Sequence, residues 1–116
     1  SKDKNLFMDG KKVFDFVNLE VIKLLTSIIK KNKKIKILFT HQASLTVENL
    51  IKNKLSQFNL IIPSNIKKIG NTVSSSIPHL INDYLKKNKL KKNSEILLCG
   101  FGVGLSVSAS VIRIIK

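Results

Sequence analysis

The chain has 116 residues, 43% of them apolar, and this length and composition are typical of one folded domain and not of a disordered segment. No uninterrupted apolar run is long enough to cross a membrane, and the polar start of the chain does not resemble a signal peptide. The single cysteine excludes an internal disulfide, which fits a cytoplasmic location.

The formal net charge is +14, from 21 basic and 7 acidic residues, and every basic residue except Arg113 is a lysine. Specific nucleic-acid readers depend on the forked arginine side chain and on exposed aromatic rings, and this chain offers little of either. We therefore expect the lysines to be solvated on helix faces and loops, or to attract an acidic protein partner. Neither a nucleic acid nor a membrane is expected as a partner.

The first elements predicted are a helix and a strand. Apolar residues recur at helical spacing, and a lysine-rich turn at 30–34 ends that pattern. The nearly continuous apolar run Ile35–Phe39 predicts a strand that is covered on both faces. The apolar face of the helix consists of Phe14, Val17, Val21, Leu24, Leu25, Ile28 and Ile29.

A second helix is predicted to follow, with Ser44 as its N-cap. Residues 60–62 then predict a brief strand that is stopped by Pro63. The apolar side of the second helix consists of Val47, Leu50, Ile51, Leu55 and Phe58.

A third helix is predicted around Pro78, and the polar segment 86–93 connects it to the next element. Residues 95–99 predict a strand broken by glycines at 100, 102 and 104, and strict alternation over 105–114 predicts another. The resulting order, αβαβαββ, predicts an α/β fold with helices packed on a mixed β-sheet. The apolar face of the third helix consists of Ile77, Leu80, Ile81, Tyr84 and Leu85.

Three short motifs place polar or backbone-exposing residues at the ends of apolar runs, where α/β proteins commonly bind ligands. They are Phe39-Thr-His-Gln-Ala-Ser44, Gly70-Asn-Thr-Val-Ser-Ser-Ser-Ile-Pro78 and Gly100-Phe-Gly-Val-Gly-Leu105. In this order and spacing they resemble the C-terminal half of the 3-oxoacyl-(acyl-carrier-protein) synthase III family, the ketoacyl synthases that start type II fatty-acid synthesis. The resemblance covers residues 6–116, nearly the whole chain.

The resemblance implies that residues 1–116 form one domain, the C-terminal half of a thiolase-like fold. It further implies that the family's nucleophilic cysteine lies in an N-terminal half that is absent here, so this chain alone is expected to be inactive. The implied activity of the whole enzyme is an acyl transfer. A malonyl thioester condenses with an acyl group in a decarboxylative Claisen reaction, in fatty-acid or related acyl biosynthesis.

His41 and Asn71 match the histidine and the asparagine of the family's active site. On this resemblance, their N–H groups stabilise the enolate that forms when the malonyl thioester loses carbon dioxide. A lone histidine is more often structural, and His79, which has no counterpart with a role in the family, is interpreted that way. No cluster of ligands predicts a metal site. No cofactor is expected beyond the substrates acyl-coenzyme A and malonyl-acyl carrier protein.

The glycine-rich stretch 100–104 runs into an alternating strand and lacks the helix that follows a dinucleotide-binding fingerprint. Taken alone, it predicts a tight turn with positive φ angles. The resemblance implies that this loop, with Gly102 and Gly104, approaches the catalytic cysteine. There the N–H of Val103 would bind the oxygen of the tetrahedral intermediate, and Phe101 would pack beside the two enolate donors and exclude water.

Cys99, together with a histidine and an asparagine, supplies the residue types of a papain-like hydrolase. It lies within the strand-like run Ile96–Cys99, however, so we expect a buried, inert thiol rather than a nucleophile.

The match departs from the family at Ser44 and Thr46, where an asparagine and a basic residue usually help to bind pantetheine and the acidic carrier protein. Lys52 and Lys54, one or two helical turns further on, could replace the lost charge. The expected partners are the enzyme's own N-terminal half, acyl carrier protein, coenzyme A thioesters and a second copy in a homodimer. A non-catalytic carrier-protein-binding module of the same fold is the alternative.

Overall fold

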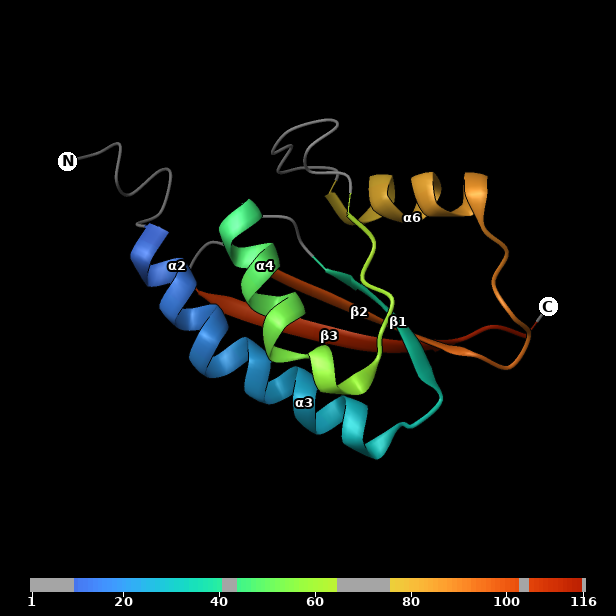
Figure 1. The fold of residues 1–116 in the computed structure, drawn as a ribbon, viewed down its shortest axis with the longest axis horizontal. Coiled ribbons are helices and arrows are strands. Elements are labelled where there is room, and N and C mark those ends of the chain that lie inside the picture. Colours follow the sequence, from blue (N-terminus) through green and yellow to red (C-terminus); the bar gives the residue numbers. More distant parts are fainter. Residues whose placement is uncertain (1–9, 41–43, 65–75, 103–104, 116) are drawn as a thin grey trace.

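A computed structural model describes residues 10–40, 44–64, 76–102 and 105–115, and Figure 1 shows their arrangement. The three strands form one mixed sheet in the order β1-β2-β3. β1 (Ile35–Thr40) pairs in parallel with β2 (Glu95–Gly102), and β3 (Ser106–Arg113) pairs with β2 in the antiparallel sense. Helices pack on this mixed sheet, as the sequence predicts.

The first helix begins earlier than the pattern predicts and contains a π-helical segment. It runs through α2 (Gly10–Phe16), the π-helical segment Val17–Val21 and α3 (Ile22–Lys31). A row of residues four apart drifts by about 40° per step around an α-helix of 3.6 residues per turn, and the wider π turn offsets part of that drift. The buried side chains of this helix form such a row, and all belong to one core cluster: Val17, Val21, Leu25 and Ile29.

The second helix, α4 (Leu45–Lys54), begins as predicted, because Ser44 Oγ accepts a hydrogen bond from the N–H of Val47 at 3.1 Å. A short 3₁₀ turn, Ser56–Phe58, follows it. Within the described residues, the strand predicted at 60–62 is reduced to one bridge. The N–H of Ile61 donates to the carbonyl of Lys36, and its carbonyl accepts from the N–H of Leu38, both at 2.9 Å. The next donor in this ladder would be residue 63, and Pro63 has no N–H.

The predicted break of β2 after Cys99 is wrong. The strand continues through Gly100 to Gly102, and these glycines pair with Ser108 and Ser106 of β3. The ladder continues because β3 supplies a partner for each residue up to Gly102. In the described part of this hairpin, the positive φ belongs to Leu105, at 52°.

β1 is buried on both faces, as predicted. Leu38 belongs to the core cluster under the long helix and α4, and Phe39 belongs to a second cluster under α6 (Ser76–Lys87). Leu85 of α6 was expected in the core, yet it is 47% exposed, because it lies at the margin of the face that Leu80 centres. No helix in the described ranges is long and apolar enough to span a membrane.

Candidate functional site

Parallel pairing of β1 and β2 brings the first and third motifs to the same edge of the sheet. Thr40, the last residue of β1, lies opposite Cys99. β2 continues three residues beyond Cys99 and ends at Gly102. His41 follows Thr40 directly in the sequence. We call the ends of these strands, at Thr40, Phe101 and Gly102, the carboxyl edge.

The helix that follows the second motif begins over the same part of the sheet. A Cβ atom placed on Gly100 would lie 3.8 Å from Cδ1 of Ile77, in the first turn of α6, and 3.7 Å from Oγ of Ser108. A side chain larger than methyl at residue 100 would therefore meet the start of α6. The start of α6 therefore lies beside the carboxyl edge, as Figure 1 shows.

Four of the predicted site residues, His41, Asn71, Val103 and Gly104, lie outside the described residues. Their assigned roles stay predictions. The side chain of His79 also lies outside the description, although its backbone is part of α6.

Two members of the glycine-rich motif are described at the end of β2. Phe101 is half-buried and packs against the core cluster on the face of the long helix and α4. It pairs with Val107 of β3, and Gly102 pairs with Ser106. Phe101 therefore joins the carboxyl edge to the larger core, an arrangement that suits an apolar wall beside a reacting group.

The predicted carrier-contact residues are not brought together. Ser44 lies at the carboxyl end of the β1–α4 connection and caps α4, whereas Lys52 and Lys54 lie at the other end of that helix. Eight residues at 1.5 Å each separate Ser44 from Lys52 by about 12 Å. Lys52 also lines a shallow depression of about 260 Å³, together with Leu55, Ser56, Asn59, Leu60 and Ile62.

A buried carboxylate near the start of α4 was not predicted. Glu48 is 4% exposed, accepts a hydrogen bond from Ser64 Oγ at 2.5 Å and pairs with Lys52 Nζ at 3.4 Å. Ser64 is the last described residue before the segment that carries Asn71. An acidic residue beside Val47 on the apolar side of a helix was the signal that could have revealed this link.

The thiol of Cys99 is fully buried, as predicted. Burial raises its pKa to about 11, and the neighbouring Thr40 hydroxyl opposes this rise only in part. Among the described residues, the buried Oγ1 of Thr40 has no hydrogen-bond partner, so its effect on the thiol is weak. A neutral, inaccessible thiol does not suit a nucleophile. Within the described ranges, no three histidine, cysteine or acidic side chains gather into a group that could hold a metal ion.

Comparison with known proteins gives one consistent result. A family model described as 3-oxoacyl-[acyl-carrier-protein (ACP)] synthase III C terminal matches residues 27–114. Beta-ketoacyl-[acyl-carrier-protein] synthase III of Streptococcus agalactiae serotype III (strain NEM316) is 35% identical over 118 residues, covering 97% of this chain and 36% of that protein. The protein of the same name from Prochlorococcus marinus (strain MIT 9515) is 33% identical over 110 residues, covering 91% of this chain and 33% of its own length.

Among solved structures, 3-oxoacyl-(acyl carrier protein) synthase III from Pseudomonas aeruginosa PAO1 is similar, with a TM-score of 0.77 and 27% identity. The likeness covers 94% of this chain and 36% of that one. The chain therefore spans about a third of the length of the relatives it matches.

Proposed function

We propose that this chain, which belongs to the family of 3-oxoacyl-[acyl-carrier-protein] synthase III C-terminal domains, forms the enolate-stabilising part of a decarboxylative condensing site. Its mixed sheet with packed helices matches the thiolase-like fold of that family. The observation that carries the proposal is the carboxyl edge. The ends of β1 and β2 and the start of α6, to which the three motifs are attached, meet there.

In the proposed reaction, the bond between the carboxylate carbon and the α-carbon of a malonyl thioester breaks. Carbon dioxide leaves, and the electron pair forms an enolate whose charge develops on the thioester oxygen. Neutral N–H donors from His41 and Asn71 stabilise that oxygen. One such donor typically contributes about 10²–10³-fold in rate.

The α-carbon then attacks an acyl thioester on the cysteine of the N-terminal half, and the cysteine sulfur leaves as a thiolate. The N–H of Val103 binds the oxygen of the tetrahedral intermediate. Phe101 limits the access of water to the carbanion, and its half-buried position against the larger core supports that role.

We place the chain in fatty-acid or related acyl biosynthesis, with acyl carrier protein or coenzyme A carrying the acyl groups. Of the proposed carrier contacts, Ser44 lies nearer the carboxyl edge than Lys52 or Lys54. The two lysines are therefore assigned to the outer surface that a carrier protein meets. The N-terminal half and a second copy complete the proposed assembly.

The proposal is tested by comparing the isolated chain with the complete product of its gene. The isolated chain should neither become acylated by acetyl-coenzyme A nor release carbon dioxide from a malonyl thioester. The complete product should do both, as measured by mass spectrometry and by carbon dioxide release. Acylation of Cys99 in the isolated chain contradicts the proposal. Carrier binding by the complete product without decarboxylation favours the non-catalytic module.

A further inference from the structure

Two lysine-rich segments, 30–36 and 86–92, lead to the end of the sheet opposite the carboxyl edge. The first segment runs into β1 and the second ends shortly before β2, and these two strands are parallel neighbours. Ile35 pairs with Glu95, and the N–H of Glu95 donates to the carbonyl of Lys34 at 3.3 Å. Segments about fifty residues apart in the sequence thus lead into neighbouring strands. In Figure 1 the first lies at the end of α3, and the second runs from the end of α6 past the C-terminus to β2.

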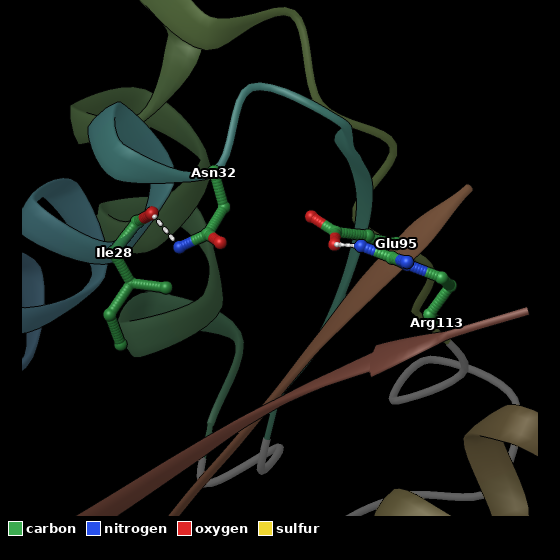
Figure 2. A network of polar contacts seen from close by, with 4 residues as sticks. All are labelled: Ile28, Asn32, Glu95 and Arg113. Atoms are coloured by element: carbon green, nitrogen blue, oxygen red, sulfur yellow. Dashed lines mark hydrogen bonds and ion pairs between the residues drawn. The ribbon is translucent and has the colours of Figure 1, made fainter. Parts of the chain in front are cut away.

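Ten of the fifteen described lysines belong to these segments, and all ten are exposed. Among the described residues, none of the ten forms an ion pair, whereas Lys11 pairs with Asp15 at 2.8 Å. The nearby carboxylate of Glu95 is already paired with Arg113 at 3.4 Å, as Figure 2 shows. We call the ten residues the lysine pole: Lys30, Lys31, Lys33, Lys34, Lys36, Lys86, Lys87, Lys89, Lys91 and Lys92.

We propose that the lysine pole binds the surface of an anionic phospholipid membrane. Clusters of four to eight basic residues on an amphipathic helix or beside a membrane span bind anionic lipids, and lysine ammonium groups suit mobile lipid phosphates because they need no fixed geometry. Two exposed aliphatic side chains lie at the same end, Leu85 at 47% and Ile115 at 78% exposure. Ile115 follows Ile114, whose carbonyl accepts the N–H of Asn93 at 2.6 Å, so it lies beside the second lysine segment. Such side chains can enter the headgroup region.

Other polyanions fit the lysine pole less well. The arginine at this end, Arg113, is engaged with Glu95, and the ring of Tyr84 packs edge-on against Phe39 with centroids 5.7 Å apart. The pole therefore offers a nucleic acid neither a free arginine fork nor a free stacking platform. A carrier protein delivering substrate must reach the carboxyl edge, and the six residues of β1 place that edge about 20 Å away.

This inference is independent of the proposed reaction. The absence of a membrane partner was expected because no segment can span a bilayer, and a peripheral electrostatic contact needs no such segment. The proposed contact with a membrane surface therefore revises the expectation that no membrane is a partner, and it does not imply a membrane-spanning segment.

The inference is tested by co-sedimentation with vesicles. The chain should bind phosphatidylcholine vesicles that contain about 30% phosphatidylglycerol and should not bind pure phosphatidylcholine vesicles. Binding should be lost when salt is raised from about 0.1 M to about 1 M, because the screening length falls from about 10 Å to 3 Å. Absence of binding to the anionic vesicles at low salt overturns the inference.

A matched pair of triple variants locates the contact. Lys33→Gln, Lys89→Gln and Lys92→Gln together should weaken vesicle binding by about 10²-fold, given the usual contribution of each lysine near an anionic surface. Lys11→Gln, Lys12→Gln and Lys23→Gln remove the same charge from the long helix and should weaken it by less than about threefold. Circular dichroism checks that both variants fold. Equal losses, or pole-dependent binding to duplex DNA without vesicle binding, contradict the inference.

Discussion

The two faces of the sheet are covered unequally. Among the described residues, the cluster under the long helix and α4 has eleven buried members, and the cluster under α6 has four. On the α6 side, the serines of β3 at 106, 108 and 110 are exposed. Most apolar burial therefore belongs to the first face, although α6 on the second face is the helix that follows the Asn71 motif.

This difference indicates that the fold and the candidate site depend on different layers. The first face holds the strands together, while the carboxyl edge also needs α6, which a small cluster centred on Leu80 keeps in place. Elements with few buried contacts open with the least free energy. We therefore expect α6 to loosen before the rest of the domain.

The largest expected effect comes from a truncation on the first face. Leu25→Ala should lower the free energy of unfolding by about 4 kcal/mol, because it leaves a cavity in the larger cluster. Leu80→Ala should cost about 2 to 3 kcal/mol, since the smaller cluster can relax more readily. Urea unfolding measures both values. A loss at Leu80 equal to or larger than that at Leu25 contradicts the ranking of the two faces.

A smaller effect should follow from the buried thiol on the first face. The pKa of Cys99 rises from 9.0 to about 11 in the folded chain, so the unfolded chain loses its proton first as the pH increases. The buried thiol therefore contributes about 2 to 3 kcal/mol to the free energy of unfolding below about pH 9, and this contribution is lost by about pH 11.

Comparing the wild type with Cys99→Ala across this pH range isolates the thiol, because the contributions of all the other groups are common to both proteins and cancel. The stability of the wild type should fall relative to that of the variant. Parallel pH profiles would show that the thiol is not buried from solvent, and that the first face is more open than described.

The smallest effect should come from the cap of α4. Ser44→Ala removes the acceptor for the N–H of Val47 and should cost about 1 kcal/mol of unfolding free energy. Ser27→Ala, at an exposed position of α3, is the control and should cost nothing measurable. A neutral result at Ser44 would show that the cap does not hold the connection from β1 to α4.

Features set by local patterns could be predicted from the sequence. The apolar run of β1 and the cap at Ser44 both depend on neighbouring residues, and both are confirmed. The continuation of β2 through Gly100 could not be predicted, because it depends on β3 as a pairing partner. The same holds for the bond between Glu48 and Ser64, which joins residues sixteen positions apart.

For the candidate site, the sequence predicted where the motifs end, and the structure brings their neighbouring strand ends and α6 together. The pairing of His41 with Asn71 depends on the resemblance to the family and stays a prediction. The lysine pole could not be predicted, because only the parallel pairing of β1 and β2 joins its two segments.

The most direct test of the central claim separates acylation from decarboxylation in the complete product of the gene. His41→Ala and Asn71→Ala should each still form the acyl-enzyme, seen by mass spectrometry, while carbon dioxide release from the malonyl thioester falls by about 10²-fold or more. His79→Ala is the control and should keep turnover near normal. If Asn71→Ala blocked acylation itself, or if His79→Ala proved as damaging as His41→Ala, the assignment of His41 and Asn71 as enolate donors would be wrong.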